Sequence, residues 1–182
     1  MLCGAVMGKS RRIKTSLFVC LSLLIGFSGG TGIKMGYEAT SFHPFSWPSN
    51  SDPIILNCYG DDFSELQLLR AIDFWAAKGH RIAYYEINPP DEVCEMESLT
   101  GFIILRKANY NQLDSVTLAS TTRTTTFVTL IDATVTFSPG SQNLDLIIEH
   151  ELGHAFGYGH VQIDDHIMHP VYNRMGKQFW IP

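Results

Sequence analysis

The sequence predicts an α+β domain with one mixed β-sheet and two principal helices. Short apolar segments of strand length are interspersed with longer segments whose apolar residues recur at helical spacing. Of the 182 residues, 45% are hydrophobic and 17% are charged, so one domain with one core is expected. The net charge is −5 and no lysine/arginine stripe follows the first fifteen residues, which argues against a nucleic-acid partner.

The first 30 residues are typical of a secretory signal peptide. Basic residues between positions 9 and 14 precede an apolar run at 17–27, and small residues follow up to Gly30, near which cleavage is expected. The run is short for a membrane span, which needs about 20 apolar residues. We therefore expect a secreted or extracytoplasmic protein. There are two alternatives. The segment could be an uncleaved N-terminal membrane anchor, which is the one expected route to a membrane, or it could be a buried core helix.

The next residues, 31–52, are rich in glycine, serine, proline and aromatic residues and predict an irregular lead-in to the domain at 53–182. The domain is expected to open with a strand at 53–59, a short apolar run.

A helix is expected at 63–78, where the apolar residues form a broad face. Asp61 or Asp62 could cap its start, and Gly79 is placed to end it. The alternating residues 80–87 then predict a strand that ends at consecutive prolines.

Three further strands are predicted before the second helix. Residues 101–105 form a buried apolar run, whereas 116–122 and 126–137 alternate and are rich in threonine and valine, which suits an antiparallel or edge position. A turn follows at Pro139-Gly140, after which Ser141 or Asn143 could cap the second helix.

The second helix carries the segment His150-Glu-Leu-Gly-His154-Ala-Phe-Gly157-Tyr-Gly-His160. Residues four apart share a helix face, so His150 and His154 can bind one ion, and imidazole suits Zn²⁺. His160 can reach the same ion only if the helix breaks, and Gly157 permits a left-handed residue there. Three histidines leave one coordination position open, the catalytic arrangement.

Glu151 lies beside the first histidine but is too near it in sequence to be an obvious ligand. We expect it to act as a general base toward water that zinc activates, and later to protonate the leaving amine. Its neighbour Glu149 is expected at the surface. His166 and His169 are expected to be polar loop residues, since three histidines already fill the site.

This segment resembles the extended zinc signature of the metzincin peptidases. Met168 follows at the position of a metzincin Met-turn. Within that clan the match is nearest to matrixins, in which a Met-x-Pro-x-Tyr pattern corresponds to Met168, Pro170 and Tyr172. The match covers 141–172. It implies a metzincin-like zincin domain with a mostly parallel twisted sheet, two main helices and an irregular C-terminal subdomain.

The resemblance also implies site roles. Met168 would form an apolar floor beneath the metal, and Pro170, Val171 and Tyr172 would line the pocket for the residue after the cleaved bond. One catalytic zinc ion is implied. No upstream His-x-Asp pattern is present, so we predict no structural zinc, and calcium has no support beyond two adjacent aspartates, which are usually solvated.

Two cysteines, Cys58 and Cys94, remain after the expected signal segment. In an oxidising compartment they could form a disulfide worth a few kcal/mol. Two unrelated buried thiols are the alternative.

The predicted function is therefore a zinc-dependent endopeptidase acting on polypeptides. A catalytically inactive, zinc-stabilised protein-binding module is the alternative. The presence of Glu151 favours the enzyme, because a degenerate relative would be expected to lose the base first.

Overall fold

A five-stranded β-sheet organises the part of the chain that the computed structural model describes, residues 45–109 and 112–181. The expected signal segment and most of the lead-in lie outside these residues. The strands follow the order β2-β1-β3-β5-β4. They are β1 (Ile54–Cys58), β2 (Tyr84–Ile87), β3 (Phe102–Lys107), β4 (Ala119–Thr126) and β5 (Thr129–Phe137). Only β4 runs antiparallel to its neighbour, so the mixed, mostly parallel sheet is confirmed.

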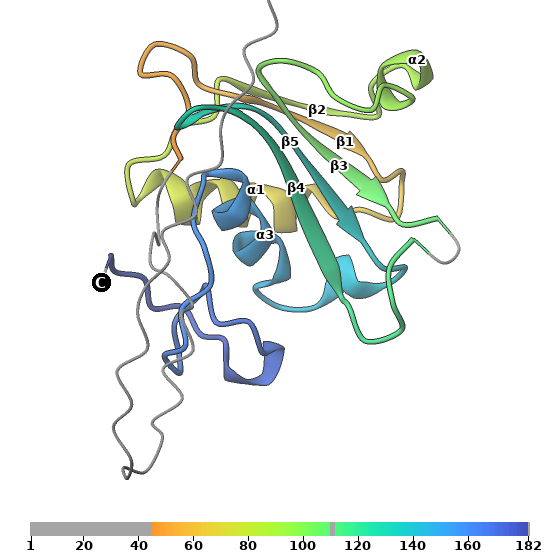
Figure 1. Cartoon of the computed structure of the whole chain (residues 1–182). Helices are drawn as coiled ribbons and strands as arrows, with labels where there is room; N and C mark the ends of the chain where they lie inside the picture. The colour runs from red at the N-terminus through yellow and green to blue at the C-terminus, as the bar shows by residue number, and fades with distance from the viewer. Residues whose placement is uncertain (1–44, 110–111, 182) are drawn as a thin grey trace, which may run out of the picture. The chain divides into compact units, whose positions relative to one another are not determined.

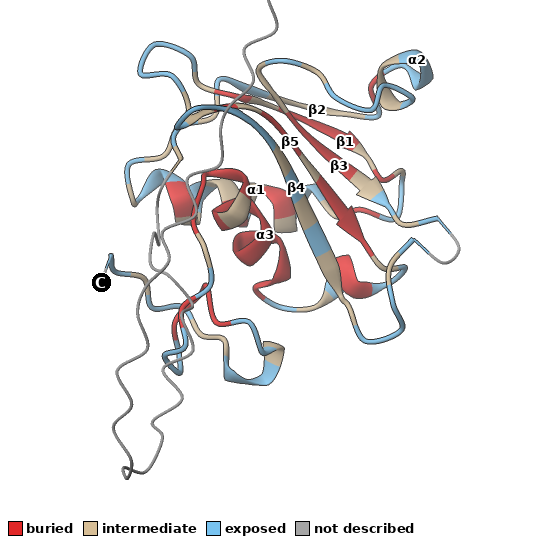
Figure 2. Ribbon diagram, viewed as in Figure 1, coloured by how far each residue is buried: buried red, intermediate tan, exposed pale blue. Residues whose placement is uncertain are grey.

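Two helices, α1 (Glu65–Ala76) and α3 (Ile147–Ala155), lie against one face of the twisted sheet (Figure 1). Figure 2 shows the buried residues concentrated between these helices and the central strands. The core combines Leu68 and Trp75 of α1 with Leu152 of α3, all fully buried. Apolar side chains of β1, β3 and β5 complete it, which explains the apolar runs of these strands.

The threonine-rich β4 lies at the edge of the sheet, as its alternating pattern predicts. Residues Phe127 and Val128 form a two-residue turn between β4 and β5, which pair as an antiparallel hairpin. The edge strand β4 also contacts α3, the helix that carries the predicted site.

Several predicted boundaries are wrong in detail. Helix α1 is capped by Ser64, whose hydroxyl accepts a hydrogen bond from the backbone of Gln67, and not by Asp61 or Asp62. Gly79 does follow the helix end in a left-handed conformation. The predicted strand at 80–87 begins only at Tyr84, because parallel pairing with β1 starts at that residue.

The start of α3 also differs from the prediction. Ser141–Asn143 form the 3-10 turn η1, and neither Ser141 nor Asn143 caps α3. The N-cap position is instead Leu146, which has a φ of 64° and provides no side-chain hydrogen bond. Hydrogen bonds from the Ser141 hydroxyl to the carbonyls of Leu118 and Ser138 tie η1 to the residues that flank the hairpin.

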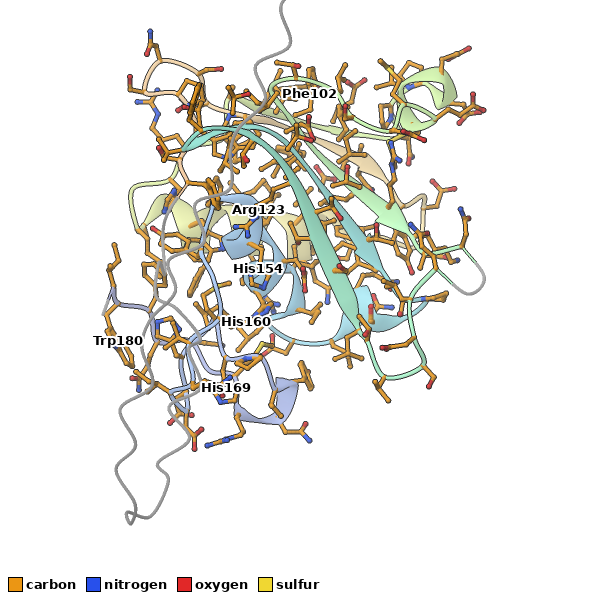
Figure 3. All side chains as sticks on the ribbon, viewed as in Figure 1. Phe102, Arg123, His154, His160, His169 and Trp180 are labelled. Carbon is orange, nitrogen blue, oxygen red and sulfur yellow. A yellow bond between two sulfur atoms is a disulfide. The ribbon has the colours of Figure 1, made fainter. Side chains whose placement is uncertain are left out.

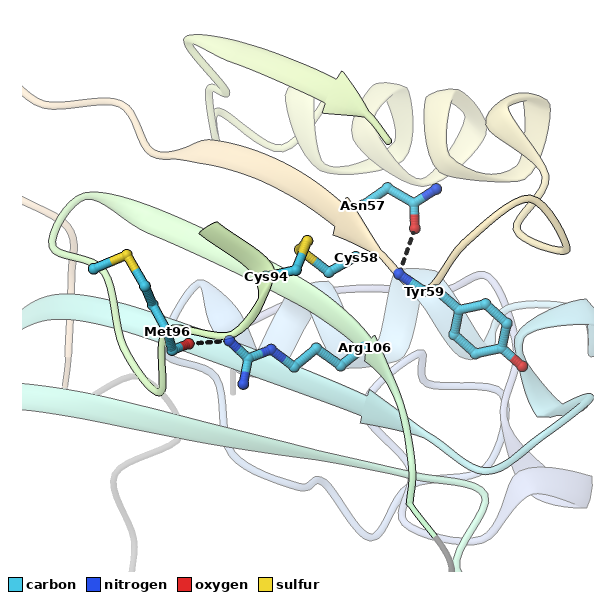
Figure 4. The surroundings of a disulfide bond; sticks show 6 residues. All are labelled: Asn57, Cys58, Tyr59, Cys94, Met96 and Arg106. Carbon is cyan, nitrogen blue, oxygen red and sulfur yellow. Dashed lines mark hydrogen bonds between the residues drawn. A yellow bond between two sulfur atoms is a disulfide. The ribbon is translucent and has the colours of Figure 1, made fainter. Parts of the chain in front are cut away.

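A short helix, α2 (Asp91–Cys94), was not predicted. It ends at Cys94, which forms a disulfide with Cys58 at the end of β1, so the expected bridge is confirmed (Figure 4). In the same region the guanidinium of Arg106 donates to the carbonyl of Met96. The disulfide thus ties the connection between β2 and β3 to the middle of the sheet.

After α3 the described chain contains only a second 3-10 turn, η2 (Tyr172–Arg174), and an isolated bridge between His166 and Gln178. This agrees with the predicted irregular C-terminal subdomain. Among residues 45–109 and 112–181, no helix combines the length and apolar character that a membrane crossing requires.

Candidate metal centre

Three imidazole rings converge where α3 meets the following loop. The Nε2 atom of His154 lies 3.1 Å from Nε2 of His150 and 3.1 Å from Nε2 of His160. Each of the three rings offers one nitrogen, and these three nitrogens all lie within 4.8 Å of one another. No other cluster of this kind occurs among the described residues. Figure 3 shows His154 and His160 close together below the C-terminal end of α3.

A helix-terminating turn at Gly157 brings the third histidine back to the first two. Gly157 has a φ of 103°, which favours glycine. Its N–H donates to His154 O at 2.9 Å, and the Tyr158 N–H donates to Gly153 O at 3.0 Å. This pair of bonds is the Schellman motif. The break predicted at Gly157 is therefore present, and it allows His160 to approach the ligand face of α3.

Hydrogen bonds fix the tautomers of two of the rings. Nδ1 of His150 lies 2.7 Å from Ile167 O, and Nδ1 of His154 lies 2.8 Å from Tyr158 O. A carbonyl oxygen can only accept, so both Nδ1 atoms carry the proton and donate. In the neutral rings, both Nε2 atoms then present lone pairs toward each other.

Burial keeps these rings neutral. Burial, and to a smaller extent the neighbouring histidines, lower the pKa of His150 to about 4 and that of His154 to about 3. Lone pairs 3.1 Å apart repel each other unless a cation lies between them. Four tetrahedral ligands at 2.0–2.1 Å from zinc are about 3.3 Å apart, close to this spacing. The three histidines are therefore positioned to bind a metal ion, and their donor set fits zinc.

The carboxylate of Glu151 lies beside this cluster on the same helix. Its side chain is buried, with 4% of the residue exposed. The Thr121 hydroxyl, from the edge strand β4, donates to Glu151 Oε2 at 2.6 Å. Burial raises the pKa of Glu151 to about 7 and outweighs the opposite effect of the Thr121 hydrogen bond. A carboxyl group with such a pKa can both accept and release a proton near neutrality.

Met168 packs in the core against Gly153 of α3. It is fully buried, and the backbone of Gly153 lies so close that a Cβ there would overlap the Met168 sulfur and come within 2.6 Å of the Trp75 ring. The glycine between the two helical histidines is thus explained by a close approach, a reason that the sequence pattern alone did not supply.

A cleft of about 680 Å³ opens over the cluster. Residues 116–121 and Arg123 line one wall, from β4 and the segment before it. The three histidines, Glu151 and the predicted pocket residues Pro170, Val171 and Tyr172 also line the cleft. The three histidines, Glu151 and the three pocket residues therefore lie around one cleft, and their roles stay predictions.

The two other C-terminal histidines lie outside the metal-ligand cluster. His166 is fully buried, and its ring contacts the backbone of Met168 and Trp180. His169 is also fully buried and accepts from the Val171 N–H through Nδ1. Both are polar residues of the loop that holds Met168, as expected, but they are buried in it.

The prediction for Glu149 was wrong. Only 1% of this residue is exposed, and its carboxylate lies 2.7 Å from the Arg70 guanidinium of α1. The expectation failed because Glu149 faces α1 rather than solvent. Thr121 and Arg123, which reach the site from β4, were not predicted, because no motif marks them.

A family model described as Matrixin matches residues 72–181, which include the three converging histidines, Glu151 and the Met168 loop. No curated protein matches the chain.

Proposed function

The chain belongs to the matrixin family of peptidases, and we propose that it is a zinc-dependent endopeptidase that hydrolyses internal bonds of polypeptides. The observation that carries this proposal is the position of Glu151. A buried carboxylate lies in the same cleft as three histidines whose Nε2 atoms converge. A module that only binds protein has no need for such a carboxylate.

The proposed reaction assigns a role to each residue. His150, His154 and His160 would hold the zinc ion, which when bound polarises a carbonyl and makes water more acidic. Glu151 accepts the proton of the attacking water and then transfers it to the leaving amine. Because Thr121 occupies Oε2, we assign this transfer to Oε1.

The edge strand β4 suggests how a polypeptide would be held. β4 lines the cleft and ends the sheet, so an extended peptide can pair with its outer edge. Such pairing recognises the backbone and would align a peptide bond with the metal ligands. We propose that Pro170, Val171 and Tyr172 contact the residue after that bond.

The test is cleavage of a diverse peptide library by the zinc-loaded full chain, with and without a chelator. We expect cleavage that the chelator abolishes and added zinc restores. Glu151→Gln should abolish cleavage while bound zinc stays at the wild-type stoichiometry. Glu92→Gln, on the exposed helix α2, is the matched control and should retain activity.

The alternative is a catalytically inactive, zinc-stabilised binding module. It would be favoured if the zinc-loaded chain cleaved no peptide, or if Glu151→Gln cleaved as well as the wild type. The two functions also differ in what zinc removal changes, because a binding module would lose stability and affinity but has no turnover to lose.

We also propose that the protein acts outside the reducing cytosol. The Cys58–Cys94 disulfide supports this location, since such bonds persist in oxidising compartments. Export through the N-terminal segment is testable by N-terminal sequencing of the secreted product, which should begin near residue 31. A product that retains residues 1–30 in the membrane fraction would favour the anchor.

A further inference from the structure

We infer that Arg123 selects substrates that carry an acidic side chain on the part of the peptide that precedes the cleaved bond. The inference rests on the proposed peptidase function. Arg123 projects from the edge strand β4 and lines the cleft together with the metal-ligand histidines. A peptide that pairs with β4 would therefore pass this guanidinium.

The positive charge of Arg123 has no carboxylate partner among the described residues. The ion pairs there engage Arg70, Arg81, Lys107 and Arg174. Arg123 is half-buried, and although this lowers its pKa, an arginine stays protonated at neutral pH. A partly desolvated cation without a counter-ion gains most from a carboxylate that a ligand brings.

The guanidinium is held in place by one of its nitrogens. Nη1 lies 3.2 Å from His154 O and 3.5 Å from Tyr158 O, at the C-terminal end of α3. The negative end of the helix dipole favours a cation at this position. The aromatic ring of Phe45 lies 5.6 Å from the Arg123 Cζ. Nε and Nη2 have no hydrogen-bond partner in the described chain and can form a bidentate pair with a carboxylate.

The position of Arg123 along the cleft decides which part of the substrate it meets. In Figure 3, Arg123 and His169 lie on opposite sides of His154 and His160. His169 directly precedes Pro170, the first residue of the pocket proposed for the residue after the cleaved bond. Arg123 is therefore at the other end of the cleft, where the preceding residues would bind.

Long-range electrostatics would not produce this preference. The formal net charge of the chain is −5, so its overall field repels acidic peptides. A preference for a carboxylate must therefore come from a local cation in the cleft. The competing explanation for Arg123 is purely structural, namely that it ties β4 to the end of α3.

The experiment uses pairs of peptides that differ only in Asp against Asn, or Glu against Gln, at each of the four positions before the cleaved bond. We measure kcat/KM for the acidic and for the amide peptide of each pair and take their ratio. This ratio is measured for the zinc-loaded full chain and for its variants Arg123→Gln, Arg123→Lys and Arg123→Glu. Arg81→Gln is the matched control, because Arg81 is an exposed cation that does not line the cleft and its loss changes net charge equally.

We expect the wild type and Arg81→Gln to favour the acid by about tenfold at one or two adjacent positions. The ratio should fall to about one in Arg123→Gln, stay above one in Arg123→Lys and invert in Arg123→Glu. Because each value is a ratio within one protein, a general loss of activity or stability cancels. A wild-type ratio near one at all four positions would overturn the inference, as would an acid preference that survives in Arg123→Gln.

If no peptide is cleaved, the same pairs serve as fluorescent ligands, and the ratio of their Kd values replaces the ratio of kcat/KM. A tenfold tighter binding of the acid that Arg123→Gln removes would then support the site although the peptidase proposal had failed. Equal binding of the acidic and the amide peptide would contradict the role of Arg123 as well, so that neither proposal would stand. The two failures are thus distinguishable.

Discussion

The hydroxyl of Thr121 donates a 2.6 Å hydrogen bond to the Glu151 carboxylate, which joins the edge strand β4 to the proposed general base. Thr121 Oγ1 also lies 3.3 Å from the backbone oxygen of Glu151. The strand that would bind substrate therefore also orients the residue that would transfer the proton. The Thr121 hydroxyl thus holds one oxygen of the Glu151 carboxylate and leaves the other oxygen available for the proposed proton transfer.

Thr121→Val should lower kcat by about tenfold, because orienting partners at metal sites contribute at this scale or more. KM for a given peptide should change much less, since the backbone of β4 is retained. Thr121→Ser keeps the hydroxyl and should retain most activity. Steady-state kinetics with zinc content measured in parallel tests this, and equal kcat values for the Val and Ser variants would contradict it.

Gly153→Ala should destabilise the protein by about 1–3 kcal/mol, because the added methyl group overlaps Met168 and Trp75. The measurement is urea unfolding of the zinc-loaded protein.

Met168→Ala alone should also be destabilising, through the cavity that it leaves. The double variant should lose less than the sum of the two single losses, since the new methyl group occupies part of that cavity. Simple additivity would show that the two residues are not in contact.

Stability of the zinc-free protein should rise as pH increases from about 4.5 to 6.5. The folded-state pKa values of His150 and His154, about 4 and about 3, lie below the ordinary value of 6.5, so in this window the unfolded chain binds more protons at these two sites. Glu151 opposes the trend, because its folded-state pKa of about 7 makes the folded chain bind more protons there.

Urea unfolding in the presence of a chelator, at several pH values, tests this balance. Two histidines outweigh one glutamate, so the free energy of unfolding should increase with pH. In Glu151→Gln the opposing contribution is gone, and the increase should be steeper. A flat or falling profile in both proteins would mean that the two imidazoles are not buried in the neutral form.

Loss of the Cys58–Cys94 disulfide should cost about 4 kcal/mol, the loop-closure value for a sequence separation of 36. The double variant Cys58→Ala/Cys94→Ala should unfold at a lower urea concentration than the wild type and should not respond to dithiothreitol. Neither cysteine lines the cleft, so kcat measured well below the unfolding transition should be unchanged. A dithiothreitol-insensitive wild type would indicate that the thiols are free.

The sequence predicted those site residues whose positions depend only on the local geometry of one helix and the turn that ends it. His150 and His154 are one helical turn apart, and Gly157 and His160 follow within six residues of the second ligand, so their convergence depends on one helix and one turn. The strands of the core were also recognisable, because burial on both faces produces continuous apolar runs.

The remaining contributions come from contacts distant in sequence. Thr121 and Arg123 are separated by 30 and 31 residues from their partners on α3, and threonine and arginine on an edge strand are ordinary solvent-facing residues. Glu149 was misjudged for the same reason, because its partner Arg70 is 79 residues away. The cap of α1 was misjudged because several polar residues competed for the position, whereas α3 begins at the apolar Leu146, which provides no side-chain cap.

Tyr158 lies between α3, which carries His150 and His154, and the loop that carries His160, and it contacts the core as well as His154. Its carbonyl oxygen receives Nδ1–H of His154, its ring stacks on Trp75 at 5.3 Å, and its hydroxyl lies 2.7 Å from Nε2 of His80. These contacts involve no metal ion. With the bond from His150 to Ile167 O, two of the three rings are thus held by the folded core itself. The apoprotein should therefore keep these two rings in place and exchange zinc without refolding, unlike small zinc domains whose folding depends on the ion.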